Sequence, residues 1–127
     1  MSVGCQLLSI HIMEQIQQEI IKKAYAAFNE RDIDQVLSAM HPRVHWPNGW
    51  EGGYVIGHAA VRDYWTRQWK ELNPRVEPTS FRESGNGKIE VLVHQLVKDI
   101  EGKILSDTMV KHIYTFDGNL ITAMEIA

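Results

Sequence analysis

The segment that decides the fold is KIEVLVHQLVKDIEGKILSDTMVKHIYTFDGNLITAMEI, residues 88–126. Apolar and polar side chains alternate along it, and the turn pairs Glu101-Gly102 and Asp117-Gly118 divide it into strand-like runs. A glycine-rich turn at 85–87 separates it from another such run over 75–83. Strands joined by such short turns must be antiparallel, so we predict a meander of strands over 75–83, 88–99, 105–116 and 120–126.

The turn at Glu101-Gly102 also assigns side chains to the faces of this sheet. A two-residue turn predicts these opposed pairs: Gln95 with Thr108, Val93 with Val110, and Val91 with His112. The face that holds His112 is mostly apolar and should lie against the helices, and the next turn places Glu125 on it as well. A turn one residue longer would exchange the faces, because side chains alternate with period two.

The opposite face of the predicted sheet mixes polar residues with apolar ones. Its apolar members are Leu92, Leu96, Met109 and Ile113. Such a face is too apolar to be fully solvated, so we expect a second copy of the chain to cover it in a homodimer.

The first half of the chain has the periodicity of helices. Apolar residues recur every three or four positions over 13–28 and over 58–72, and Asp32 with Gln35 resembles a capping box for a short helix that Pro42 ends. A short strand follows at 44–46, and then a loop rich in glycine and aromatic residues. Residues 1–12 lack a clear period. We therefore predict an N-terminal extension over 1–12 and, over 13–127, a single α+β domain with three helices packed on a curved antiparallel sheet.

Composition and charge exclude several classes of protein. The 127 residues are 44% hydrophobic and 23% charged, which is typical of one globular domain. A net charge of -3 without a basic tract argues against a nucleic-acid partner, and no apolar run reaches the roughly 20 residues of a membrane helix. The single cysteine, Cys5, favours a reducing compartment, so we expect a cytoplasmic protein. No ligand spacing indicates a metal, and we expect no cofactor.

Three segments carry a family resemblance: YAAFNERDID at 25–34, GHAAVRDYW at 57–65 and KHIYTFDGNL at 111–120. With the order of helices and strands, they make the chain resemble the nuclear transport factor 2-like superfamily, and within it the SnoaL-like, polyketide cyclase-like and ketosteroid isomerase-like proteins. The resemblance implies a cone-shaped α+β barrel whose helices and curved sheet enclose an apolar pocket. It also implies a homodimer formed through the outer face of the sheet.

Most catalytic positions of the ketosteroid isomerases are changed in this chain. The resemblance places their catalytic Asp at Trp46, so that general base is missing. Their oxyanion-hole Tyr would fall at about Ala24, next to Tyr25, and their oxyanion-hole acid at His112, two residues before Tyr114. Steroid isomerisation by that route is therefore disfavoured, while the pocket that hosts it is expected to persist.

Two ionisable residues are candidates for catalysis. His112 is the predicted polar centre of the pocket, because an imidazole on an apolar face can polarise a carbonyl or shuttle a proton. The alternative is a buried neutral histidine satisfied by Gln95, Thr108 or a water. Glu125 is a candidate general base if burial raises its pKa, and the alternative is a carboxylate at the rim that is solvated or paired with an arginine.

The remaining expected pocket residues supply aromatic walls and hydrogen-bonding groups. They are Trp46, Trp50, Tyr54, Trp65, Gln68, Trp69, Gln95, Thr108, Tyr114 and Tyr25. Three functions stay open at this point. The first is proton-transfer chemistry of isomerase, cyclase, dehydratase or hydrolase type on a small hydrophobic carbonyl compound. The second is binding of such a molecule without turnover, and the third is a dimeric interaction module that uses the outer face.

Overall fold

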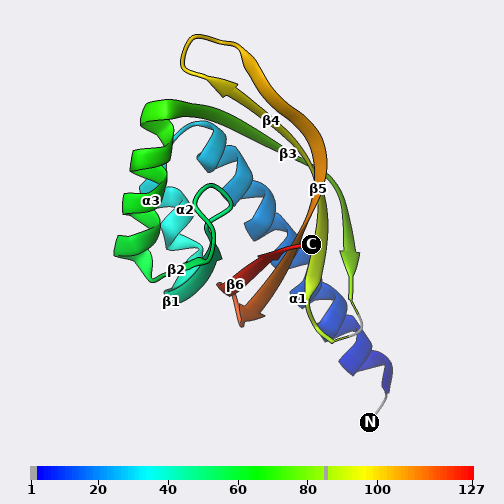
Figure 1. Cartoon of the computed structure of the whole chain (residues 1–127). Coiled ribbons are helices and arrows are strands. Elements are labelled where there is room, and N and C mark those ends of the chain that lie inside the picture. The colour runs from blue at the N-terminus through cyan, green and yellow to red at the C-terminus, as the bar shows by residue number, and fades with distance from the viewer. Residues whose placement is uncertain (1–2, 85) are drawn as a thin grey trace.

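The helices lie against the concave side of one curved sheet (Figure 1). The computed structural model describes residues 3–84 and 86–127, with side chains from residue 12 onward. In chain order the elements are α1 (Val3–Asn29), α2 (Ile33–Ser38), β1 (Met40–Pro47), β2 (Tyr54–Ile56), α3 (His58–Glu71), β3 (Leu72–Glu83), β4 (Ile89–Asp99), β5 (Ile104–Asp117) and β6 (Leu120–Ile126). The predicted α+β class, with three helices on a curved sheet, is confirmed.

Local sequence signals set the ends of the helices. Asp32 caps α2, since its Oδ1 accepts a hydrogen bond from the Gln35 backbone N at 3.2 Å, as the capping pattern predicts. The helix ends at Ser38, earlier than the predicted end at Pro42, and β1 begins at Met40.

The predicted extension over 1–12 is helical from Val3 as part of α1, whereas residues 1–2 and the side chain of Cys5 lie outside the described residues. No helix in the described part of the chain is long and apolar enough to cross a membrane.

The sheet has six strands in the order β2-β1-β6-β5-β4-β3 and does not close into a barrel. The predicted meander β3 to β6 is antiparallel throughout. In contrast to the prediction of a purely antiparallel sheet, β1 runs parallel to β6 and pairs Met40 with Ile121. β3 is an edge strand, which explains how it tolerates Pro74 and Pro78: a residue without an N–H is accepted where no ladder partner needs one.

The central register of the β4–β5 hairpin is the predicted one. The pairs Gln95 with Thr108, Val93 with Val110, and Val91 with His112 are confirmed. The turn itself is one residue longer than predicted, because Asp99 N donates to Lys103 O at 2.9 Å. Lys98 pairs with Ile104 and Val97 pairs with Ser106, so Leu105 is an extra residue on β5. This bulge restores the predicted register for the rest of the hairpin. His112 therefore lies on the predicted face through two compensating shifts.

A second bulge, between β5 and β6, overturns the prediction for Glu125. Thr115 pairs with Ala123 but Phe116 pairs with Ile121, so Thr122 is an extra residue on β6. One extra residue reverses the alternation of faces beyond it. As a result Ile126, not Glu125, shares the inner face with His112.

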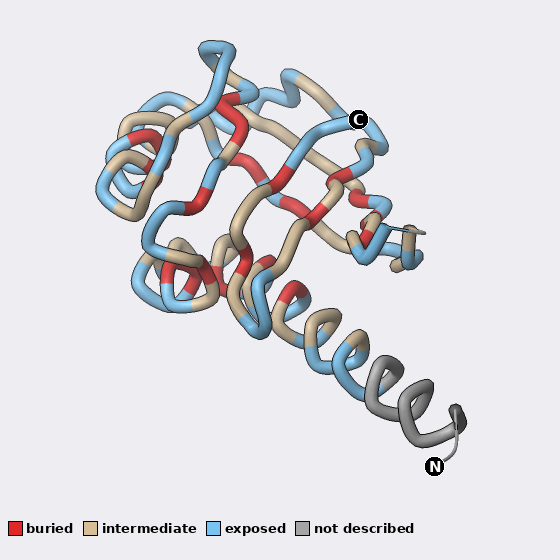
Figure 2. The backbone as a smooth tube through the Cα atoms, turned by 90° about the horizontal axis from the view of Figure 1, so that it is seen from below, coloured by how far each residue is buried: buried red, intermediate tan, exposed pale blue. Residues whose placement is uncertain are grey.

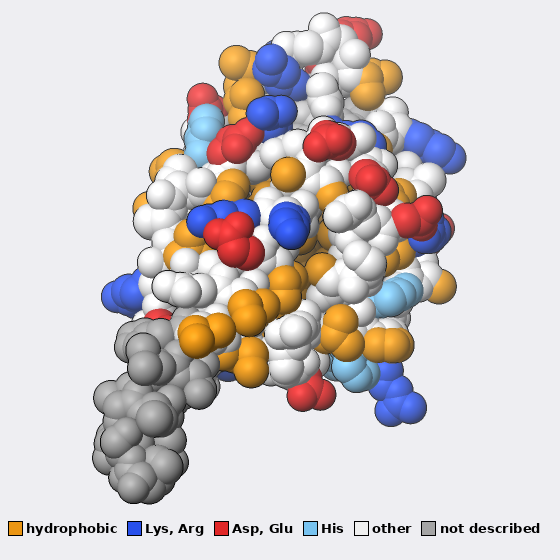
Figure 3. All heavy atoms as spheres, turned by 180° about the vertical axis from the view of Figure 1, so that it is seen from behind, with side chains coloured by type: hydrophobic (Ala, Val, Ile, Leu, Met, Phe, Trp, Pro, Cys, Tyr) orange, Lys and Arg blue, Asp and Glu red, His pale blue; other side chains and the backbone are white. Residues whose placement is uncertain are grey.

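Buried residues concentrate where the helices meet the sheet (Figure 2). Ile21 of α1, Val61 of α3 and Val91 of β4 are completely buried and join one hydrophobic core. The outer face of the sheet is more exposed: Leu92 retains 40% and Met109 49% of its accessible surface. Seen from behind, hydrophobic side chains lie among acidic and basic ones on the surface (Figure 3).

Candidate functional site

A cavity of about 390 Å³ lies between the helices and the inner face of the sheet. Aromatic and aliphatic side chains make up most of its wall. The tyrosine, amide and imidazole groups that line it belong to Tyr25, Tyr64, Gln68, Gln95, His112 and Tyr114. Among the described residues that line it, none is an Asp, Glu, Lys or Arg. Two lining residues, Gly49 and Ile126, are exposed, which places an opening between the 48–53 loop and the end of β6.

A chain of hydrogen bonds from helix to strand forms the polar centre of the cavity. The Tyr114 hydroxyl donates to the Tyr25 hydroxyl at 2.8 Å, and the Tyr25 hydroxyl lies 2.7 Å from His112 Nδ1. Tyr25 projects from α1 on the same side as Ile21 and Phe28, four residues before it and three after. His112 and Tyr114 are two apart on β5 and therefore share its inner face.

These hydrogen bonds accommodate the tautomer of His112 that carries its proton on Nε2. When Tyr114 donates to Tyr25 and Tyr25 donates to His112 Nδ1, each hydroxyl proton of the chain is used in a hydrogen bond. The neutral imidazole then carries its proton on Nε2. No side chain or backbone group in the described part of the chain pairs with Nε2, so the cavity contains an N–H donor available to a ligand.

Burial keeps this polar centre uncharged. It lowers the pKa of His112 to about 4, so the imidazole is neutral at physiological pH. Burial also raises the pKa of Tyr25, and the neighbouring Tyr114 raises it further. The pKa of Tyr114 is raised by burial as well, against the opposing effect of its hydrogen bond to Tyr25. The site can therefore donate and accept hydrogen bonds, but it presents no charge to a bound molecule.

Aromatic rings form one wall of the cavity. Trp46 of β1 meets Trp65 of α3 edge to face, with ring centroids 5.6 Å apart, and Phe28 of α1 meets Trp65 in the same way at 5.2 Å. Trp69 stacks behind Trp65 at 5.9 Å and does not line the cavity. Its Nε1 is buried without a hydrogen-bond partner among the described residues.

The 48–53 loop holds Trp50 beside the opening of the cavity. Asn48 is buried, and its Oδ1 accepts from the backbone N of Trp50 at 3.2 Å and of Glu51 at 2.7 Å. The Glu51 carboxylate reaches Arg67 of α3 at 2.8 Å, and this contact holds the pKa of Glu51 below its usual value. The loop is thus fixed to its own backbone and to α3.

The chain matches the family model described as SnoaL-like domain over residues 21–124. It belongs to the SnoaL-like domain family. The family and its nuclear transport factor 2-like superfamily are those that the sequence resembles.

Solved structures with the same fold support the assignment. The SnoaL-like chain is 30% identical to TerC, crystallised with polyporic acid, with a TM-score of 0.77 over 88% of this chain and 90% of TerC. It is 25% identical to a protein of unknown function from Burkholderia pseudomallei, described as NTF2-like, with a TM-score of 0.77 over 88% and 89% of the two chains. RV0760c from Mycobacterium tuberculosis, in complex with estradiol-17beta-hemisuccinate, shares the fold at 16% identity, with a TM-score of 0.75 over 87% and 92%. No curated protein matches the sequence.

Most of the residues predicted for the SnoaL-like pocket do line the cavity. They are Tyr25, Trp46, Trp50, Trp65, Gln68, Gln95, His112 and Tyr114. Trp46, where the resemblance to the isomerases led us to expect their catalytic Asp, is part of the aromatic wall. The hydrogen-bond partner of His112 is Tyr25, rather than Gln95 or Thr108.

The other predicted residues lie elsewhere. Trp69 is behind the wall, and Tyr54 is 55% exposed on β2, which pairs with β1 where the sequence indicates a loop. Thr108 is exposed although its register is as predicted. Glu125 pairs with Ile113, away from the cavity, and its carboxylate lies 3.7 Å from Lys88 Nζ.

Tyr64 is the polar cavity residue that sequence reasoning missed. It is one helical turn before Gln68, whose Nε2 donates to the Tyr64 hydroxyl at 3.3 Å. That spacing on the apolar face of α3 is the signal that could have found it. Among the described residues, no group of three or more His, Cys, Asp or Glu side chains is placed to hold a metal ion.

Proposed function

We propose that this SnoaL-like domain binds a small, largely apolar molecule whose buried part is uncharged and carries an oxygen that accepts a hydrogen bond from His112 Nε2. The observation that carries this proposal is the cavity of about 390 Å³ in which the Nδ1 side of His112 is already occupied by Tyr25. Its size lies within the range of small-molecule sites, about 300–1,000 Å³.

The chemistry of the wall favours a neutral guest. A charged group moved from water into an apolar cavity needs an opposite charge or a full set of hydrogen bonds. The described lining residues include no Asp, Glu, Lys or Arg, and burial keeps His112 neutral with a pKa of about 4. A carbonyl or phenol oxygen at Nε2 satisfies the free donor without introducing a charge.

Two structural relatives are known with small molecules. TerC was crystallised with polyporic acid, and RV0760c with estradiol-17beta-hemisuccinate. These structures support small-molecule binding as the use of this fold here, and they supply probes.

Proton-transfer catalysis is the second candidate, favoured by the continuous Tyr114–Tyr25–His112 chain. A donor aimed at a carbonyl oxygen stabilises negative charge that develops on that oxygen. If Nε2 gave its proton to the ligand and the imidazole were reprotonated at Nδ1 through Tyr25 and Tyr114, Tyr114 would become a buried phenolate. The raised pKa of Tyr114 opposes this ionisation. We therefore infer that His112 polarises the ligand and that a turnover reaction needs a base other than the described side chains of the cavity wall.

Ligand titration tests the binding proposal directly. Polyporic acid, estradiol-17beta-hemisuccinate and estradiol are titrated into the protein and followed by tryptophan fluorescence, because Trp46, Trp50 and Trp65 line the cavity. For the probe that binds tightest, His112→Ala should weaken binding by about fivefold to tenfold, as expected for one hydrogen bond. Thr108→Ala, on the same strand but outside the cavity, is the matched control. Binding that His112→Ala leaves unchanged, or no binding of the three probes, contradicts the proposal.

We also propose that the chain forms a homodimer through the outer face of the sheet. The supporting observation is the exposure of Leu92 and Met109 on neighbouring strands, where a partner would remove apolar surface from water. This contact would leave the cavity on the other face free to bind its ligand.

A further inference from the structure

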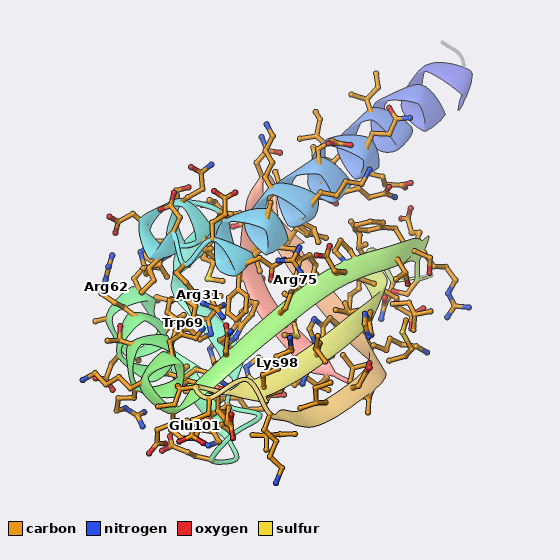
Figure 4. All side chains as sticks on the ribbon, turned by 90° about the horizontal axis from the view of Figure 1, so that it is seen from above. Arg31, Arg62, Trp69, Arg75, Lys98 and Glu101 are labelled. Atoms are coloured by element: carbon orange, nitrogen blue, oxygen red, sulfur yellow. The ribbon has the colours of Figure 1, made fainter. Side chains whose placement is uncertain are left out.

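A second, smaller cavity lies at the edge of the sheet, where the end of α1 meets β3 and β4. We call it the edge cavity, and its volume is about 130 Å³, the space of several water molecules. Its charged lining residues are Arg31, Arg75 and Lys98, and no described residue that lines it carries a carboxylate. Figure 4 shows Arg31 at the end of α1, with Arg75 and Lys98 on the neighbouring strands.

Strand register brings two of these cations onto one face. Asn73 of β3 pairs with Lys98 of β4, and Arg75 pairs with Leu96. Residues two apart on a strand share a face, so Arg75 and Lys98 are diagonal neighbours. The alternate residues of β3, including Pro74, line the larger cavity on the inner face.

Beside them, Arg31 is held by neutral acceptors and pairs with no carboxylate in the described part of the chain. Its guanidinium carbon lies 4.9 Å from the ring centroid of Trp69. Its N–H groups donate to Pro74 O at 2.8 Å, to Phe28 O at 3.2 Å and to the side-chain oxygen of Asn73, all of which are neutral acceptors. Burial lowers the pKa of Arg31, and the charge of Arg75 lowers it further. Placing a half-buried cation next to another cation costs free energy, and a bound anion would offset that cost.

The backbone of Arg31 adopts a conformation that is uncommon for a residue with a side chain. Its φ of 63° lies in the left-handed region, where the structure shows no other residue with a side chain in its described part. Arg31 ends α1 at the position that glycine usually takes, because Arg31 N donates to Phe28 O at 3.0 Å and Asp32 N to Ala27 O at 2.9 Å. Glycine would adopt this conformation without strain, but it would remove the guanidinium.

Existing ion pairs leave most of this charge uncompensated. Arg75 contacts Glu77 at 2.7 Å, but the two side chains are 62% and 47% exposed, and such surface pairs are weak. Neither Arg31 nor Lys98 forms an ion pair with a residue whose side chain is described.

We propose that the edge cavity binds a small oxyanion, a phosphate or a carboxylate, through Arg31, Arg75 and Lys98. Beyond the three hydrogen bonds it already makes, Arg31 retains its Nε–H and one Nη1–H as donors, and Arg75 and Lys98 add positive charge from the adjoining strands. This site shares Pro74 with the larger cavity, but the proposal does not rest on the function proposed for that cavity.

Calorimetric titration of the whole chain with sodium phosphate and sodium acetate, at constant ionic strength set with chloride, tests the proposal. We expect one anion to bind per chain. Lys98→Gln should weaken binding about threefold to fivefold, and Arg75→Gln combined with Lys98→Gln at least about tenfold. Glu77→Gln should strengthen binding, because it removes the competing carboxylate.

The matched control is Lys103→Gln, which removes the same charge from the β4–β5 turn outside the edge cavity. It should leave the affinity unchanged. These side chains are at least partly exposed, so circular dichroism should show that each variant folds. Binding of neither anion overturns the proposal, as does an equal loss of affinity in Lys98→Gln and Lys103→Gln, which would indicate general charge screening.

Discussion

The Tyr25 hydroxyl lies 2.7 Å from Nδ1 of His112 and joins α1 to β5 inside the cavity of about 390 Å³. Both residues are buried, so this contact orients the imidazole and also ties the helix to the sheet. Because it engages Nδ1, it leaves Nε2 as the ring nitrogen that can meet a ligand.

Tyr25→Phe should lower the free energy of unfolding by about 1–3 kcal/mol, because it leaves the buried Nδ1 and the Tyr114 hydroxyl without their partner. Urea denaturation measures the change. Tyr114→Phe is the control, since it retains the Tyr25–His112 contact and should destabilise less. A Tyr25→Phe protein as stable as the wild type would show that the contact contributes nothing.

Stability should fall as the pH is lowered from 7 to 5, with His112 as a principal cause. Its pKa is about 4 in the folded chain, below the ordinary 6.5, so the unfolded chain binds more protons over this range. The stabilisation is fully present above pH 6.5 and is lost as the pH falls toward 4. The expected loss between pH 7 and 5 is about 2 kcal/mol. Urea denaturation at both values should show a smaller loss for His112→Gln, and an unchanged loss would disprove the assignment.

Asn48→Ala should loosen the loop that carries Trp50. The substitution removes the acceptor of the Trp50 and Glu51 amides and should destabilise the chain by about 1–2 kcal/mol. Hydrogen exchange at these two amides should become faster. Glu51→Gln, which retains both amide contacts, should leave their exchange close to that of the wild type, and equal exchange in all three proteins would argue against the role of Asn48.

Met109→Glu should shift the proposed homodimer toward monomer, because it places a charge in the apolar outer face. Sedimentation velocity at several concentrations measures the change. Thr108→Glu adds the same charge at the adjacent exposed residue, which faces the other side of the sheet, and should have little effect. A wild-type protein that sediments as a monomer at every concentration would contradict the homodimer.

The features that depend on neighbouring residues could be predicted from the sequence. They include the helix over 58–71, the Asp32 cap and the antiparallel meander, because periodicity and turn pairs act over a few residues. The side chains of β4 and β5 that face the cavity were also predictable. That prediction holds because the longer turn and the bulge at Leu105 each shift the register by one residue, and the two shifts cancel.

Only the tertiary structure decided the contacts that make the sites. An alternating sequence pattern does not reveal a bulge. The bulge at Thr122, which places Glu125 on the outer face, could therefore not be predicted. The parallel pairing of β1 with β6, the partnership of Tyr25 with His112, and the meeting of Arg31 with Arg75 and Lys98 each join residues far apart in the chain. Local sequence preferences specify helices, strands and turns, whereas long-range neighbours are set by how those elements pack to bury their apolar faces.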